Sequence, residues 1–112
     1  DIGNSAVAKG CTILGEVKNT VLSYGSSVAE GAQVSYSVVM PNAVIEAGAR
    51  VSYAIVGEGC HVGKNAVVGG TPGSVDFDRW GIAVLGPHTA VPDGGVVEPK
   101  MMLGANGKEV RP

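Results

Sequence analysis

Two histidines are the residues of this sequence whose type best suits proton transfer. His61 stands one position before Val62, a member of an apolar repeat, so its side chain should point away from the interior. An outward imidazole is suited to act as the general base of an acyl transfer, although an exposed surface histidine is the better interpretation. His88 falls where other copies of the repeat carry Gly or Asn, which favours a conformational role over a ligand role. Two histidines are also too few for a three-histidine zinc site within one chain.

The remaining residues of chemical interest are two cysteines and a pair of aspartates. Cys11 and Cys60 occupy the same small inward position of the repeat, three coils apart, which places them roughly 14 Å from each other. That separation is beyond the reach of a disulfide, so both are expected to be reduced core residues. Asp76 and Asp78 lie in an irregular stretch and have no spacing that marks a metal pair. The sequence therefore predicts neither a catalytic residue nor a metal ligand.

The elements that carry these residues come from an internal repeat of seventeen residues. "YSVVMPNAVIEAGARVS" at 36–52 and "YAIVGEGCHVGKNAVVG" at 53–69 agree in residue type at almost every column, and 19–35 is a third copy. A large aliphatic recurs at spacings of six, six and five, with a small residue two positions earlier. Residues 4–18 are a copy shortened by two, 70–81 interrupt the pattern, and 82–98 restore it. The large positions are Val7, Ile13, Val17, Leu22, Val28, Val34, Val39, Ile45, Val51, Val56, Val62, Val68, Leu85, Val91 and Val97.

This spacing predicts an all-β fold. A helix would place apolar residues three and four apart. In a strand, residues i and i−2 face the same side, so a large and a small inward residue fit one short flat side of a triangular coil. The corners need residues that tolerate positive φ. Two corner columns have such types: Gly25, Asn42, Gly59 and His88 in one, and Gly31, Gly48, Asn65 and Gly94 in the other. The prediction is a parallel β-helix of about five coils over residues 1–98, with a loop insertion at 70–81 and a C-terminal tail at 99–112.

Composition limits the function further. The chain has 112 residues, of which 45% are hydrophobic but only 4% aromatic, and its formal net charge is −2. That charge disfavours a nucleic-acid partner, and no run approaches the roughly 18 apolar residues of a membrane span. The start has neither an initiator Met nor a signal-peptide core, and we expect cytoplasmic material. Ile2 falls in the column of Val17, the last inward residue of a coil, so we also expect more protein upstream.

The repeat, together with "WGIAVLG" and "VVEPKMM", resembles the C-terminal domain of glucose-1-phosphate adenylyltransferase (ADP-glucose pyrophosphorylase) over residues 4–103. The resemblance implies a left-handed β-helix, which the spacing alone does not determine. It also implies a parent enzyme that joins ATP and glucose 1-phosphate to give ADP-glucose and pyrophosphate for glycogen or starch synthesis. The Mg²⁺ and ATP sites belong to an upstream catalytic domain that this sequence lacks, so we expect no catalytic residue and no cofactor here.

The same resemblance implies partners. Family members form tetramers, the β-helix packs on its own catalytic domain, and anionic sugar-phosphate effectors bind nearby. Lys100 follows the last coil, where the family carries a basic residue for effector phosphate; a solvated lysine is the alternative. Tyr36 and Tyr53 stack in one corner column, and Phe77 and Trp80 lie in the interruption. These four aromatics are candidates for an interface, or they serve only to cover the column.

The sequence thus predicts an assembly and regulatory domain of a nucleotidyltransferase, acting in a homo- or hetero-oligomer. A second hypothesis is a self-contained hexapeptide acyltransferase that acts as a trimer with coenzyme A and uses His61 as its base. An upstream reading frame with a Gly-rich nucleotide loop would support the first hypothesis. A stable trimer that binds coenzyme A would support the second.

Overall fold

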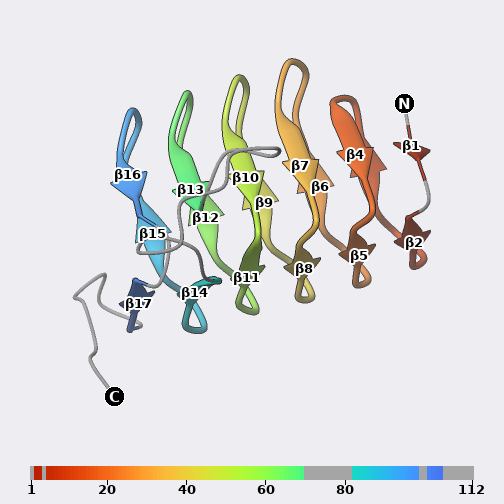
Figure 1. The fold of residues 1–112 in the computed structure, drawn as a ribbon. Coiled ribbons are helices and arrows are strands. Elements are labelled where there is room, and N and C mark those ends of the chain that lie inside the picture. Colours follow the sequence, from red (N-terminus) through yellow and green to blue (C-terminus); the bar gives the residue numbers. More distant parts are fainter. Residues whose placement is uncertain (1, 4, 70–81, 99–100, 105–112) are drawn as a thin grey trace.

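The computed structural model describes residues 2–3, 5–69, 82–98 and 101–104, and the strands in these ranges form three parallel sheets (Figure 1). Sheet A contains β1 (Ile2–Gly3), β4 (Glu16–Lys18), β7 (Gln33–Ser35), β10 (Arg50–Ser52), β13 (Val67–Gly69) and β16 (Val96–Val97). Sheet B contains β2 (Ala6–Val7), β5 (Val21–Leu22), β8 (Val38–Val39), β11 (Ala54–Val56), β14 (Ala83–Leu85) and β17 (Met102–Leu103). Sheet C contains β3 (Thr12–Ile13), β6 (Ser27–Val28), β9 (Val44–Ile45), β12 (His61–Val62) and β15 (Ala90–Val91).

The strand register reproduces the sequence repeat. Val7 pairs with Leu22, which confirms that the first coil is two residues short. Val34 pairs with Val51 at the full seventeen, and Val62 pairs with Val91 across the interruption. The chain winds as a left-handed β-helix, one strand of each sheet per coil (Figure 1). Each coil is therefore held to the next by hydrogen bonds on all three sides.

The interior is filled as predicted. The large aliphatics from Leu22 to Val68 are at most 1% exposed, and Leu85, Val91 and Val97 are also buried. The small residues two positions before them, from Thr20 to Ala66, are buried as well. Each side of a coil is a strand of two or three residues, and it has room for one large and one small inward side chain. The stacked coils therefore enclose a solid aliphatic column.

The first coil departs from this pattern. Val7 is 39% exposed and Ile13 is only half-buried, although both occupy the inward columns of the deeper aliphatics. These two residues lie in the edge strands β2 and β3, which have a neighbouring strand on one side only among the described residues. An inward side chain is buried mainly by the coils on either side of it, so a residue at the end of the column stays partly accessible.

All eight predicted corner residues have positive φ, as the sequence pattern required. A third corner, between sheets A and B, was not predicted as strained, yet Asn19, Tyr36 and Tyr53 also have positive φ there. In the first two corners, each Asn or His side chain lies against a glycine at the same corner of the preceding coil. A Cβ on Gly25 would lie 2.3 Å from Asn42 Oδ1, and one on Gly48 would lie 2.2 Å from Asn65 Oδ1. Glycine at these two positions adopts the positive φ without strain and also leaves room for the asparagine amide of the next coil.

The structure adds a strand that the sequence analysis placed in the C-terminal tail. Val84 pairs with Met102 and Leu85 with Leu103, so β17 continues sheet B beyond residue 98. The sequence separation between these paired residues equals neither the seventeen of the repeat nor the separation across the interruption. For this reason the repeat did not predict strand β17. Within the described residues, no helix is long and apolar enough to cross a membrane.

Candidate functional site

The three sheets differ in the charge of their outward side chains, and sheet B has no charged residue at its outward positions among the described residues. Its outward column is apolar in every strand, and Val21, Val38 and Ile55 are 48%, 38% and 37% exposed. The second outward position of each strand is also uncharged. The described residues at these two positions, here called the B face, are Ala6, Ala8, Val21, Ser23, Val38, Met40, Ile55, Gly57, Val84, Gly86, Met102 and Gly104.

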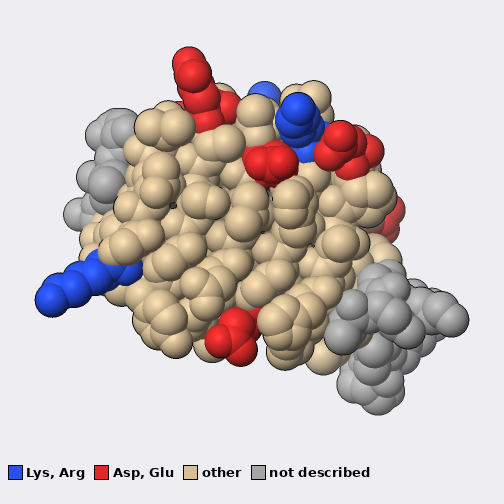
Figure 2. All heavy atoms as spheres, turned by 180° about the vertical axis from the view of Figure 1, so that it is seen from behind, with Lys and Arg blue, Asp and Glu red and all other residues tan. Residues whose placement is uncertain are grey.

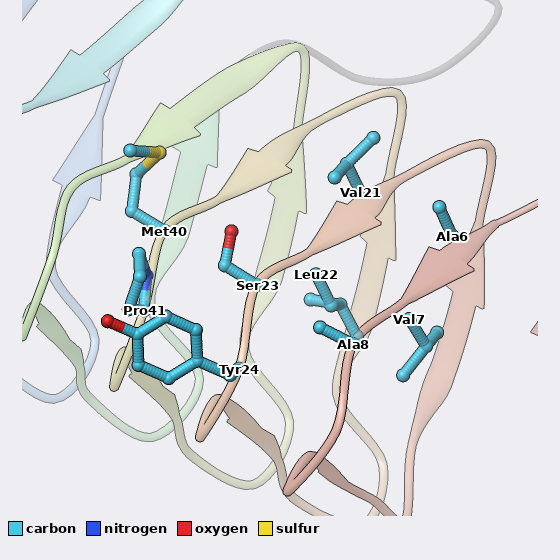
Figure 3. Close-up of a pocket in the computed structure, with 9 residues that line it drawn as sticks. All are labelled: Ala6, Val7, Ala8, Val21, Leu22, Ser23, Tyr24, Met40 and Pro41. Carbon is cyan, nitrogen blue, oxygen red and sulfur yellow. The ribbon is translucent and has the colours of Figure 1, made fainter.

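A groove of about 460 Å³ opens at the N-terminal end of the B face. Figure 3 shows Tyr24, Met40 and Pro41 grouped on one side of it, and Val7 and Ala8 on the other. Tyr24 is 58% exposed, because it stands at the turn that leaves sheet B for sheet C. The groove is lined mostly by apolar atoms, and the Ser23 and Tyr24 hydroxyls are its side-chain polar groups among the residues that Figure 3 labels.

Sheet A has the opposite character. Its outward positions include Glu16, Lys18, Gln33 and Arg50, and Glu16 Oε1 lies 2.9 Å from Lys18 Nζ. The hydrogen bond from Lys18 and its positive charge lower the pKa of the Glu16 carboxyl, and the same contact raises the pKa of the Lys18 ammonium. Both groups are largely solvated, so this pair contributes little to stability.

Sheet C forms the rear face of the molecule, where acidic and basic side chains lie mostly towards the edges (Figure 2). Its outward residues include His61 and Glu46, with 3.4 Å between His61 Nε2 and Glu46 Oε2. The His61 side chain is 51% exposed, so the predicted outward orientation is confirmed. A carboxylate can hold an imidazole in one orientation, which is an arrangement that general-base catalysis uses.

Tyr36 and Tyr53 stack at the corner between sheets A and B, as predicted, with ring centroids 5.0 Å apart and planes 5° from parallel. Both have positive φ, 50° and 49°, which is costly for a bulky residue. Whether these tyrosines form an interface stays a prediction.

Hydroxyl groups complete the hydrogen bonding at this same corner. Thr20 Oγ1 donates to the carbonyl of Lys18 and accepts from the backbone N–H of Ser37. Ser37 Oγ in turn donates to the carbonyl of Ser35 and accepts from the N–H of Ala54. Small inward hydroxyls therefore satisfy backbone groups that the turn leaves out of the sheets. This explains why the small column contains Thr and Ser next to the tyrosines.

The cysteines are free and belong to the core, as predicted. Cys60 is buried and its Sγ–H donates to the carbonyl of Gly86, 3.0 Å away. Burial raises the pKa of the Cys60 thiol, which keeps it protonated and unreactive at neutral pH. Cys11 is half-buried near the open first coil and donates to the carbonyl of Ser23. His88 has a φ of 58°, which agrees with the conformational role expected for it.

Three predicted site residues, Phe77, Trp80 and Lys100, lie outside the described residues, as do Asp76 and Asp78, which were not expected to form a metal pair. Within the described ranges, no group of three His, Cys, Asp or Glu is placed to hold a metal ion. The B face was missed at the sequence level although its signal was present. Each coil begins with two adjacent aliphatics, as in Val21–Leu22, Val38–Val39 and Ile55–Val56, whereas the later strands place polar residues before most of their buried aliphatics.

Comparison with protein families gives the assignment. Residues 1–86 match the model described as GlmU-like, C-terminal hexapeptide. The chain belongs to this GlmU-like hexapeptide family. It shares the all-β, parallel β-helix of hexapeptide-repeat proteins.

Three curated relatives of this hexapeptide chain are named glucose-1-phosphate adenylyltransferase. The protein of Desulfitobacterium hafniense is 36% identical over 100 residues, covering 86% of this chain and 24% of the relative. That of Acetivibrio thermocellus is 39% identical over 98 residues, covering 83% and 23%. That of Bacillus thuringiensis is 45% identical over 112 residues, covering 96% and 22%. The chain spans about a quarter of the length of these relatives and matches their C-terminal region.

Among solved structures, the acetyltransferase domain of PglB from Neisseria gonorrhoeae, in complex with acetyl coenzyme A, superposes with a TM-score of 0.68. The match covers 97% of this chain and 53% of that one at 16% identity. At such low identity the similarity establishes the shared hexapeptide fold and nothing further.

Proposed function

We propose that this chain is the C-terminal assembly and regulatory domain of a glucose-1-phosphate adenylyltransferase. The observation that carries the proposal is the coverage of its relatives. Similarity extends over most of this chain but only about a quarter of proteins with that name, at their C-terminal region. The enzyme activity in the relatives' names would then belong to a part of the polypeptide outside this chain. We expect the complete protein to be cytoplasmic.

The residues that the structure describes do not fit the cofactors of that reaction. Mg²⁺ prefers several oxygen ligands, and the described residues offer no group of three acidic or metal-binding side chains. Nor does the sequence contain a Gly-rich loop followed by a helix that would hold ATP phosphates. In this proposal Mg²⁺ and ATP bind to the upstream catalytic domain, and no chemical step is derived for the chain itself.

The test of the reaction uses the complete polypeptide that the gene encodes. Purified protein with Mg²⁺, ATP and glucose 1-phosphate is expected to release pyrophosphate and form ADP-glucose, both measurable by coupled assay and chromatography. An absence of turnover with these substrates, in protein shown to be folded, would reject the proposed activity.

The assembly role has a separate test. Removing residues 1–112 from the complete polypeptide is expected to lower the oligomer from a tetramer to a smaller species by sedimentation velocity. A truncated protein that stays tetrameric would reject the assembly role. Both results can be obtained without any activity measurement.

The regulatory role is tested at Lys100. We expect Lys100→Ala in the complete protein to weaken activation by anionic sugar phosphates at least several-fold, because an ammonium group that contacts phosphate is lost. Lys64→Ala is the matched control, since Lys64 is an exposed lysine in the turn between β12 and β13. Equal responses of the two variants would remove Lys100 from the effector site.

A trimeric acyltransferase is the second candidate, and the pairing of His61 with Glu46 is the observation that favours it. It predicts saturable binding of coenzyme A to this chain in calorimetry, and loss of acyl transfer in His61→Ala. No heat of binding at millimolar coenzyme A would reject this alternative.

A further inference from the structure

We infer that residues 101–104, here called the end strap, form a closure of the C-terminal end of the column, and that this closure opens while the coils stay folded. The end strap contains β17 and follows the last coil. The closure involves only residues of this chain, so it stands whether or not the proposed function is correct.

The two ends of the column differ in how well their inward side chains are covered. In the first coil, Val7 is 39% exposed. Val91 and Val97 also lie in the outermost described strands of their sheets, yet they are only 3% and 2% exposed. Met101 and Leu103 are partly buried and pack against the core. Among the described residues, those that follow the last coil and pack on this end therefore belong to the end strap.

The residue type at position 101 suits the end of the column and no inner coil. Strand pairing aligns Leu103 with Leu85, which places Met101 on the small inward column together with Ala83. The members of this column in the inner coils are small and buried: Thr20, Ser37 and Ala54. A methionine would overpack an interior that has coils on both sides. At the end of the column, its long flexible side chain can fill the space that another coil would occupy.

The end strap contacts the last coil on more than one side. In sheet B, the backbone N–H of Gly86 donates to the carbonyl of Leu103. Beside sheet C, Thr89 Oγ1 donates to the carbonyl of Gly104, with 2.6 Å between the two oxygens. Thr89 is fully buried, so the strap supplies the acceptor that its hydroxyl needs in the interior.

The contact with sheet A replaces a hydrogen bond that another coil would make. In the inner coils, the N–H one residue after a buried aliphatic donates to a carbonyl of the next coil, as Gly63 does to Val91. Glu98 has the same place after Val97, in the outermost described strand of sheet A. Its backbone N–H donates to Met101 Sδ, with 3.2 Å between nitrogen and sulfur. Met101 thus packs on the end of the interior and also accepts from the edge of a sheet.

The end strap has fewer partners than an inner strand. β17 has two residues and pairs on one side only, with β14, whereas β11 pairs with a strand on each side. Edge segments with few partners open locally at a lower free energy than the whole domain. Opening would expose Leu85 and Thr89, which are now at most 1% exposed. A molecule that binds this end of the column would therefore compete with the strap.

Hydrogen exchange in the complete polypeptide tests whether the strap opens by itself. Gly86 and Gly57 are a matched pair, because each N–H donates to a carbonyl of the next strand of sheet B. For Gly86 that strand is β17, and for Gly57 it is β14. Mass spectrometry of short fragments follows each amide separately. After correction for intrinsic rates, we expect the Gly86 amide to exchange at least about tenfold faster than the Gly57 amide. Equal rates would mean that the strap opens only with the column and would overturn the inference.

Two neighbouring methionines test what holds the strap. Met101 is inward and half-buried, whereas Met102 is outward and 36% exposed. Met101→Ala should speed exchange at Gly86 a further fivefold or more, with the rate at Gly57 unchanged. Met102→Ala is the control and should change neither rate by more than about twofold. Equal effects of the two variants would overturn the inference, as would an acceleration of both amides by Met101→Ala.

A conservative variant guards against misfolding of the alanine variant. Met101→Leu keeps most of the apolar volume, so exchange at Gly86 should stay within about threefold of the unmodified protein. A leucine variant that exchanges as fast as the alanine variant would contradict closure by packing at this position.

Discussion

Val38 in sheet B and Val67 in sheet A are the same residue type in equivalent strands, and they are almost equally exposed. Their surroundings differ. Val38 lies between Val21 and Ile55 on the adjacent coils, whereas Val67 lies between Arg50 and Val96. Both sheets present the same aliphatic interior, so packing of the column does not explain the contrast. The column does not constrain the outward positions, so its packing does not require that those of sheet B carry no charge.

The largest expected effect separates the inner from the outer side of sheet B. Leu22→Ala should lower the free energy of unfolding by about 2–5 kcal/mol, because it leaves a cavity in a column that cannot close around it. Val21→Ala, one residue away on the outer side, should change it by about 0.5 kcal/mol or less. Urea unfolding of both variants measures the difference. Similar losses would mean that the outer row also supports the fold.

A second pair of variants tests the corners that join the sheets. Gly25→Ala should cost about 2 kcal/mol, because φ is 72° and the new Cβ would clash with Asn42 Oδ1. Gly94→Ala has φ of 71° but nothing within 4 Å of the new Cβ, so it should cost only about 1 kcal/mol. Thermal unfolding compares them. Equal costs would show that backbone strain alone accounts for these glycines.

The corner between sheets A and B gives a smaller effect. A double-mutant cycle with Tyr36→Ala and Tyr53→Ala should return a coupling of about 1 kcal/mol for the stacked rings. Because each variant keeps a positive φ at its corner, the backbone cost cancels in the cycle. Additive losses in chemical denaturation would show that the rings are stacked without stabilising each other.

The smallest effect concerns the charges on sheet A. The pKa of Glu16 is lowered in the folded chain, so its stabilising effect is present above its unfolded pKa and lost as pH falls through the folded value. The raised pKa of Lys18 has the reverse consequence: its effect is present below the unfolded pKa and lost as pH rises through the folded value. Lys18→Gln should move the Glu16 titration to higher pH in NMR spectra. An unchanged titration would mean that the ion pair is not formed in solution.

Much of the fold was determined by the sequence alone. A large aliphatic every six residues specified three-sided coils, and Gly, Asn and His at fixed offsets located two of the three corners. These inferences succeed because each repeat contacts only its neighbours, so that local spacing carries over directly into stacking. The resemblance to the adenylyltransferase C-terminal domain added the left-handed winding, which a six-residue spacing leaves open.

Other features were decided only by the tertiary structure. The positive φ of the tyrosine corner was not indicated by its residue types, and strand β17 pairs at an offset that the repeat does not contain. The exposure of Val7 depends on its place at the end of the column, which no residue pattern within a coil reports. The B face needs six coils in register before scattered aliphatics become one surface, because residues seventeen apart meet only when the chain has wound completely around.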